Sequence, residues 1–208
     1  VTTTKFEIRS EGNFDGKGPA IFVGSTKFAK ANGCDAAKLS LDSVIMKTVG
    51  SNLILCGAGP RGSLYAVYTF LEDVVGCKWW TSTESDIPSR PTLEISKLDY
   101  VYDPKIKFRE AFYQDVLGYY PVDDATEADM TNLKFAVQLK LNGYYHVIPE
   151  EYGGHLRLGQ CHSFYSRLMP PERYYAQHPE WYSLIDGKRV VGNHVGQLCL
   201  TNDEMRKE

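Results

Sequence analysis

Residues 57–62, with the sequence GAGPRG, have the glycine spacing of a loop that binds the pyrophosphate of a dinucleotide. In such a loop the glycines let the backbone approach the ligand at the N-terminus of a helix. Here, however, the preceding strand looks like one arm of an antiparallel hairpin, and Pro60 removes one amide donor. The acidic residue needed about twenty positions later would have to be Glu84 or Asp86, in a polar loop. The glycines therefore indicate a tight strand-to-helix turn.

His155, Cys161 and His162 form a set of metal-ligating side chains that are close in the sequence. A zinc site needs three or four ligands that converge in space. A Cys–His or Ser–His relay also depends on convergence, which adjacency in the sequence does not supply. We therefore expect no metal site and no cofactor.

Carboxylates are plentiful between residues 110 and 204, but no pair stands apart from the others. Glycoside hydrolysis commonly uses two carboxyl groups that flank the scissile bond. Glu150 and Glu151 follow a candidate strand at residues 144–148, and barrel enzymes place their site residues at strand ends. Charged pairs on loops usually face solvent, so a solvated loop is the favoured interpretation.

Strand and helix signals alternate over residues 1–100, which predicts a small α/β domain. Gly24, Gly33 and Gly76 each mark the end of a predicted element. The clearest predicted elements are a strand at 20–23, a helix at 26–32, a hairpin of 44–48 and 52–56, and a helix at 64–75. Prolines at 88, 91 and 104 mark the predicted domain boundary.

Residues 101–208 continue the rhythm of strand, helix and strand, which is typical of a parallel α/β architecture. The predicted elements are strands at 106–112, 144–148, 181–185 and 196–200 and helices at 126–141 and 170–177. A complete eight-fold barrel takes roughly 250 residues. We therefore expect only the first strand–helix units of a TIM-type barrel in this part of the chain.

The two ends of the sequence indicate a piece of a longer protein. Val1 is not a methionine, so we expect a processed or engineered start. Residues 201–204, with the sequence TNDE, have the form of a capping box that begins a helix, and only four residues follow.

Composition excludes several classes of protein. With 208 residues, 43% apolar, and a formal net charge of −3, the chain has the make-up of a folded globular protein rather than of an electrostatic nucleic-acid binder. No apolar run approaches the roughly 20 residues of a membrane-spanning helix. We expect neither a nucleic-acid partner nor a membrane span. Five cysteines, several with apolar neighbours, indicate buried free thiols rather than a disulfide framework.

Several segments resemble known carbohydrate-active proteins. Residues 103–109, DPKIKFR, resemble the opening barrel strand of glycoside hydrolase family 20, the β-N-acetylhexosaminidases. Residues 140–146, KLNGYYH, resemble the segment that leads into that family's second strand. Residues 57–80 look like the helix that closes the small α/β domain of family 20 enzymes and family 67 α-glucuronidases. Closer still is the bacterial domain-of-unknown-function 4838 family, through the segments CHSF, PPERY, HPEW, DGKR and QLCLTN between residues 161 and 202.

The resemblance implies substrate-binding residues but no catalytic ones. Arg109 stands where family 20 has an arginine that holds sugar hydroxyls, although Glu110 replaces the usual glycine. Tyr145 and His146 lie near the first of that family's histidines, and His162 corresponds to a histidine at a later strand end. The family's catalytic Asp–Glu pair lies on the fourth barrel strand, beyond the part resembled here.

The resemblance thus implies a domain of the hexosaminidase or α-glucuronidase N-terminal type at 1–100, followed by an incomplete barrel at 101–208. The parent protein would be a secreted or periplasmic glycosidase that acts on hexosaminide- or glucuronide-containing glycans, and this chain alone would be inactive. Its cut barrel edge would pair with a second copy. One alternative is a noncatalytic glycan-binding module that uses Trp181 and its tyrosine neighbours as stacking platforms. The less favoured alternative is a nucleotide-binding domain built on Gly57, Gly59 and Gly62.

Overall fold

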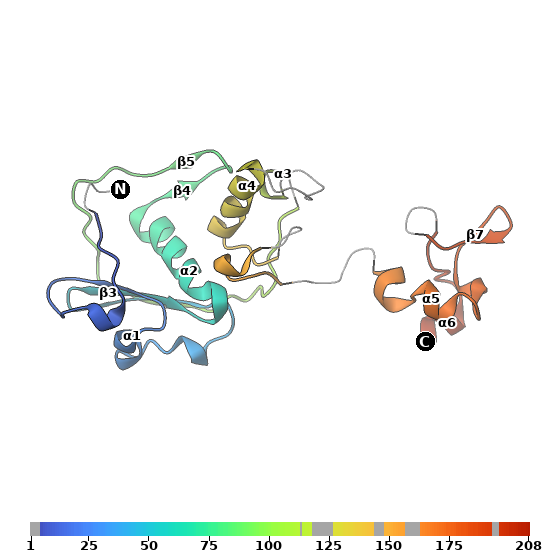
Figure 1. Cartoon of the computed structure of the whole chain (residues 1–208), viewed down its shortest axis with the longest axis horizontal. Coiled ribbons are helices and arrows are strands. Elements are labelled where there is room, and N and C mark those ends of the chain that lie inside the picture. The colour runs from blue at the N-terminus through green and yellow to red at the C-terminus, as the bar shows by residue number, and fades with distance from the viewer. Residues whose placement is uncertain (1–4, 113, 118–126, 144–147, 157–162, 193–195) are drawn as a thin grey trace. The chain divides into compact units, whose positions relative to one another are not determined.

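The computed structural model describes residues 5–112, 114–117, 127–143, 148–156, 163–192 and 196–208, and it has a mixed α/β fold with small sheets (Figure 1). The chain forms two compact units, Val1–Arg157 and Leu158–Glu208. The boundary predicted near residue 100 falls inside the first unit, at strand β6 (Asp99–Tyr102).

The first unit contains a four-stranded sheet with the strand order β1-β3-β2-β6. Strand β1 (Ile21–Val23) runs parallel to β3 (Asn52–Gly57), whereas β2 (Val44–Val49) is antiparallel to both β3 and β6. Gly50 takes a φ of 58° in the turn between β2 and β3, a conformation that costs glycine little. The predicted hairpin is therefore confirmed.

Alternate residues of the strands face two separate cores, as the two-residue period of a strand requires. On one face Val44, Met46, Leu53 and Leu55 pack against the following long helix. On the other face Ile45, Ile54 and Cys56 pack with Phe22 and with helix α1 (Lys27–Ala31). Thr26 caps α1 by accepting a hydrogen bond from the Ala29 amide, and Gly33 (φ 80°) follows its end, so the helix predicted at 26–32 is confirmed.

Helix α2 (Gly59–Thr69) continues into a π-helical segment, Phe70–Val75, that ends at Gly76 in the left-handed conformation. The helix predicted at 64–75 is confirmed and begins five residues earlier than its apolar pattern indicated. Two short strands, β4 (Lys78–Trp79) and β5 (Ser85–Asp86), pair after it.

Helix α4 (Glu127–Gln138) lies on the side of α2 away from the sheet (Figure 1). Its buried face, with Leu133, Ala136 and Val137, shares a core with Val116 of helix α3 (Gln114–Leu117) and with Ile148. Leu64 and Tyr68 of α2 pack against this core. Helix α2 is therefore the middle layer between the sheet and α4.

Residues 103–112 form no strand, so the buried strand predicted at 106–112 is wrong. The side chains of Ile106 and Phe112, expected in the core, are 69% and 77% exposed. The strand predicted at 144–148 lies almost wholly outside the described residues.

The second unit has a small aromatic core of its own. Helix α5 (Pro171–Tyr174) is shorter than the helix predicted at 170–177, and α6 (Asp203–Lys207) begins after Asn202, whose side chain caps it in place of the expected Thr201. The strands predicted at 181–185 and 196–200 meet in a single bridge between Tyr182 and Leu198. Asp186 and Gly187, both at positive φ, form the turn of a hairpin of β7 (Leu184–Ile185) and β8 (Lys188–Arg189).

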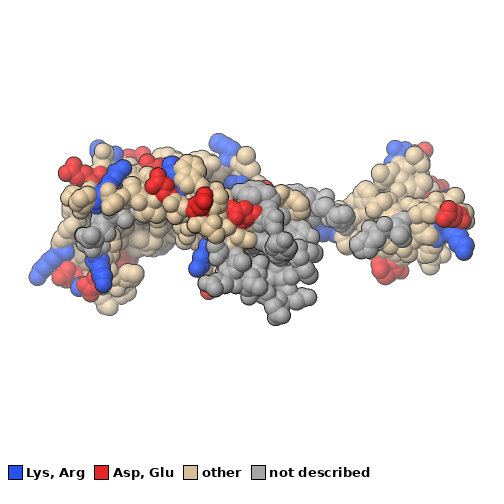
Figure 2. Space-filling model, turned by 90° about the horizontal axis from the view of Figure 1, so that it is seen from above, with Lys and Arg blue, Asp and Glu red and all other residues tan. Residues whose placement is uncertain are grey.

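Short helical turns complete the described structure. A π-helical turn spans Phe164–Leu168, and 3-10 turns span Glu11–Asn13, Ala36–Lys38, Glu150–Tyr152 and Pro179–Trp181. None of the described helices has the length and apolar character that crossing a bilayer requires. Positive and negative side chains are interspersed on the face shown in Figure 2.

Candidate functional site

The glycine-rich loop makes a close backbone contact between the end of β3 and the start of α2. A β-carbon at Gly57 would lie closer than 3.0 Å to the Gly62 carbonyl and to the Ser43 oxygen, and a β-carbon at Gly62 would meet Gly57 in the same way. Gly59 has a φ of 71°. Glycine is required here by the backbone itself, and the predicted strand-to-helix turn is confirmed.

A buried carboxylate, Asp42, lies beside this loop and is the centre of a polar network. Its Oδ1 accepts a hydrogen bond from Arg61 Nε at 2.9 Å. Its Oδ2 accepts from Arg109 Nη2 at 2.9 Å and from Asn142 Nδ2 at 2.6 Å. The Asp42 side chain is 2% exposed and that of Arg61 is 4% exposed. Such a buried charge is tolerated only when it is paired and hydrogen-bonded, as it is here.

Arg61 ties the first turn of α2 to a second glycine turn. Its Nη1 donates to the carbonyl oxygens of Gly153 at 2.9 Å and Gly154 at 3.1 Å. Both glycines have positive φ, and a β-carbon at Gly153 would collide with the Arg61 side chain. The turn at 153–154 is therefore shaped to receive this guanidinium.

The structure places Arg109 in the same network. Its Nε donates to the Lys140 carbonyl at 3.0 Å and its Nη1 to the Ile106 carbonyl at 2.9 Å, in addition to the bond to Asp42. Its side chain is 20% exposed. Three of its N–H groups thus bind protein acceptors, and its contact with sugar hydroxyls stays a prediction.

Glu110 and Asp115 are the acids that lie nearest to Arg109 in the described sequence after it. The partner in the structure is Asp42, 67 residues away. Asp115 instead accepts hydrogen bonds from the amide and hydroxyl of Ser82.

Arg109→Ala should destabilise the protein by about 2–3 kcal/mol, because it removes a charge-assisted hydrogen bond to the buried Asp42 carboxylate and two hydrogen bonds to backbone carbonyls. Asp42 keeps Arg61 and Asn142, which limits the loss. Urea unfolding gives the measurement, with Arg206→Ala as the matched control because Arg206 pairs with Asp203 at the exposed surface. If Arg109→Ala lowers the free energy of unfolding by less than about 0.5 kcal/mol, as ordinary surface substitutions do, Arg109 does not have this structural role.

Three backbone segments lie side by side next to this network, in the order of the chain. The Arg109 carbonyl accepts from the amides of Asn142 at 3.1 Å and Gly143 at 2.9 Å. The Asn142 carbonyl in turn accepts from the Leu156 amide at 2.7 Å. The Asn142 side chain also bridges the first segment, by accepting from the Arg109 amide at 2.8 Å and donating to the Lys107 carbonyl at 2.8 Å.

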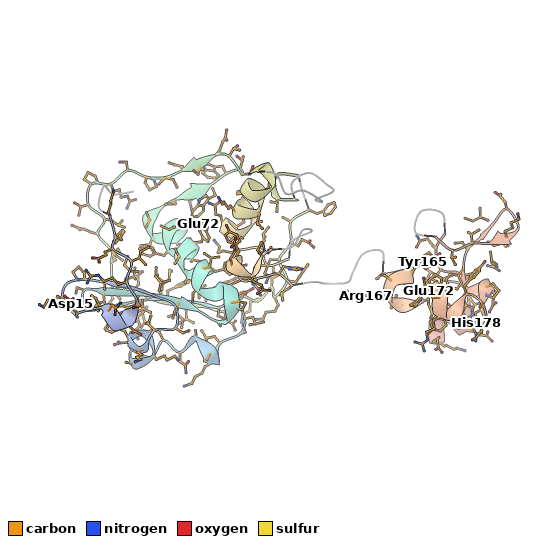
Figure 3. The ribbon with its side chains drawn as sticks, in the orientation of Figure 1. Asp15, Glu72, Tyr165, Arg167, Glu172 and His178 are labelled. Carbon is orange, nitrogen blue, oxygen red and sulfur yellow. The ribbon has the colours of Figure 1, made fainter. Side chains whose placement is uncertain are left out.

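The turn after α4 is held by α2 and by the π-helical segment that follows it. The Tyr65 hydroxyl donates to the Leu141 carbonyl at 2.6 Å, and burial raises the pKa of this phenol. Glu72, labelled in Figure 3, pairs with Lys140, which has a left-handed φ of 60°. These contacts fix the position of residues 140–143.

A second polar cluster joins Ser40, Ser43, Asp103 and Lys107 near the surface. Hydrogen bonds from Ser40, Ser43 and Lys107 lower the pKa of Asp103 to about 2, with Ser40 as the largest contribution. Lys107 Nζ donates to Ser40 Oγ at 2.7 Å. A lysine that activates a serine must be uncharged and desolvated, whereas Lys107 is 56% exposed and lies 3.3 Å from the Asp103 carboxylate. This cluster therefore anchors a loop to the end of β6.

Only some of the other site residues predicted from the sequence lie within the described residues. Tyr145, His146 and His162 lie outside the described residues. Glu150 and Glu151 are exposed in a 3-10 turn, as the solvated-loop interpretation predicts. Within the described ranges no three His, Cys, Asp or Glu side chains converge as a metal site would require.

Trp181, a candidate stacking platform, is 4% exposed. The ring of His178, labelled in Figure 3, stacks on it with centroids 4.0 Å apart and an angle of 11° between the planes. Its neighbour Tyr182 is fully buried and donates to the Met169 carbonyl. Both rings belong to the core of the second unit, so neither offers an exposed face for a sugar.

Four cysteines, Cys34, Cys56, Cys77 and Cys199, are free thiols, and Cys161 lies outside the described residues. The first three are buried, and burial raises the pKa of Cys56 to about 11. Cys199 is partly exposed, and a hydrogen bond with the Thr201 hydroxyl lowers its pKa.

Cys199 should therefore react with iodoacetamide on the order of 100-fold faster than Cys56 at pH 8, because the thiolate is the reactive form. Peptide mass spectrometry at increasing times resolves each thiol, and the rates should become similar in strong denaturant. Equal rates under native conditions would contradict the burial of Cys56.

Comparison with known proteins identifies the family of this chain. Residues 79–207 match the family described as "Domain of unknown function (DUF4838)". Neither the curated proteins nor the solved structures include a match to this chain. The match includes Asn142 and Arg109 of the network, with both glycines of the 153–154 turn, and it spans more than half of the chain. The chain therefore belongs to the DUF4838 family.

Proposed function

We propose that this chain is part of a carbohydrate-active protein, a glycoside hydrolase that acts on hexosaminide- or glucuronide-containing glycans outside the cytoplasm. Its catalytic carboxylates would lie on a later barrel strand than those resembled here. The proposal rests on the resemblance of residues 103–109 and 140–146 to the first two barrel segments of such enzymes.

One observation in the structure supports this proposal more than any other. The segments at Arg109, Asn142 and Leu156 are joined by backbone hydrogen bonds in chain order, and α4 connects the first to the second. Neighbouring parallel strands joined by a crossover helix are the repeating unit of a (β/α) barrel. The backbone hydrogen bonds between the first two segments, with α4 as their connection, support the proposal that barrel units begin here, although the described residues of these segments form no strand.

In this proposal the Asp42 network sets the position of the barrel's first segments. Arg109 and Asn142 bind Asp42 with their side chains and each other through the backbone. Catalysis requires reacting groups to be held within a fraction of an ångström, and such precision comes from rigid support. The network would thus orient the strand ends that carry the substrate-binding residues.

The proposal is tested with the whole protein that contains this sequence. Aryl β-N-acetylhexosaminides and aryl glucuronides are incubated with it, and release of the aryl alcohol is followed, while binding to a glycan panel is measured in parallel. We expect hydrolysis of at least one class by the whole protein and none by the 208-residue chain. Glycan binding without hydrolysis would favour a noncatalytic module, and the absence of both would overturn the proposal.

A further inference from the structure

We propose that residues 5–156 unfold as one cooperative unit, in which α2 is a core element shared by the sheet and by the barrel-like segments at 103–156. This inference concerns the folding of the chain and does not depend on the carbohydrate proposal. It implies that the barrel-like segments have no independent stability, although the sequence pattern places a domain boundary near residue 100.

The first observation is that α2 is buried on two sides. Tyr65 and Ala66 of α2, with Phe70 of the π-helical segment that continues it, belong to the core above the sheet. Leu64 and Tyr68, on the other side of the helix, pack against the core of α4. Unfolding of α4 would therefore expose one apolar face of α2, and unfolding of the sheet would expose the other. Because exposure of apolar surface to water is unfavourable, unfolding of either part would destabilise the part that remains folded.

The second observation is the buried charge network, which crosses between the same two parts. Asp42 and Arg61 come from the sheet side, whereas Arg109 and Asn142 come from residues 103–156. Arg61 also donates to the Gly153 carbonyl. Separation of the two parts would leave Arg61 and Asp42 without most of their partners, and each hydrogen bond to a buried charge is costly to break.

The third observation is that each part contains a strained residue held by the other. Asp42 has a φ of 67° and Lys140 a φ of 60°, and left-handed conformations are uncommon for side chains with a β-carbon. Arg109 donates to the Asp42 carboxylate, and Glu72 of the π-helical segment pairs with Lys140, so each of the two residues is held by a partner from the other part. Such conformations persist only where the surrounding structure fixes them.

Native-state hydrogen exchange of the full chain tests the proposal. Ile54→Val removes one methyl group from a fully buried side chain on the far face of the sheet, in the core with α1. The slowest amides of β3 should then exchange about 2- to 10-fold faster, the range expected for buried Ile→Val changes. If residues 5–156 unfold together, the slowest amides of α4 must accelerate by the same factor.

Ile8→Val is the matched control, because the Ile8 side chain is 96% exposed and its substitution should change neither set of amides. Val137→Ala, in the buried face of α4, provides the reciprocal test and should accelerate exchange in β3 as strongly as in α4. Equal factors in β3 and α4 for both buried variants support the proposal. Acceleration in β3 with unchanged exchange in α4 after Ile54→Val, or the reverse after Val137→Ala, would overturn it.

Discussion

Asp42→Ala should destabilise the unit formed by residues 1–157 by about 3–5 kcal/mol, the cost of removing one partner from a buried ion pair. The substitution leaves the guanidinium of Arg61 buried without a carboxylate and removes an acceptor from Arg109 and Asn142. For a unit of this size the melting temperature should fall on the order of 10 °C. Thermal melts and urea unfolding give the two measurements.

Asp35→Ala is the control for this prediction. Asp35 also lies in the loop region before β2 and also forms an ion pair, with Lys38, but the Lys38 side chain is 80% exposed. A surface pair of this kind contributes about 0–1 kcal/mol. If Asp42→Ala and Asp35→Ala lower the free energy of unfolding by the same amount, the network does not contribute to stability as its burial implies.

Among substitutions that add a single methyl group, Gly57→Ala should destabilise the protein most. We expect the free energy of unfolding to fall by at least about 3 kcal/mol, the upper end of the range for overpacking. The atoms that the new β-carbon would meet are backbone atoms of Gly62 and Ser43, which cannot rotate away as a side chain could. The end of β3 and the first turn of α2 would have to separate, and Arg61 would move with them. Urea unfolding measures the loss.

Gly12→Ala is the matched control, since no atom lies within 4 Å of the β-carbon that it would add. Its effect should stay within about 0.5 kcal/mol, as for other exposed substitutions. Tolerance of alanine at Gly57 would show that the close approach of the two backbones is not required for folding.

Sequence patterns predicted the sheet hairpin, α1 and α2 correctly because their signals are local. Gly50, Gly33 and Gly76 each occupy a positive φ directly at the end of an element, and the apolar periods between them match the buried faces. The same locality explains the small error at α6, where Asn202, next to the expected Thr201, provides the cap.

The polar network could not be predicted in this way. Asp42 finds its three side-chain partners 19, 67 and 100 residues away, and nothing in its local sequence distinguishes it from other loop aspartates. Arg109 was singled out only through the resemblance to a sugar-binding position. The sequence therefore indicated that Arg109 matters without indicating which groups it binds.

The error at residues 106–112 has a related cause. Apolar residues there predicted a buried strand, but two backbone carbonyls of the segment accept from side chains instead of from a neighbouring strand. The Ile106 carbonyl binds Arg109, and the Lys107 carbonyl binds Asn142. The side chain of Ile106 lies at the surface.

Strand β6 has a consequence for the behaviour of the protein at high concentration. Among the described strands, β6 pairs only with β2, and its residues Tyr100, Val101 and Tyr102 are partly exposed. An exposed strand edge of this kind can act as a template for aggregation through strand pairing. Antiparallel self-pairing centred on Val101 would, however, place Asp99 opposite Asp103 of the second copy. Like charges directly opposite each other destabilise a strand pair. These opposed acids would make self-pairing of this edge less favourable, and Lys107, 3.3 Å from Asp103, offsets part of the repulsion.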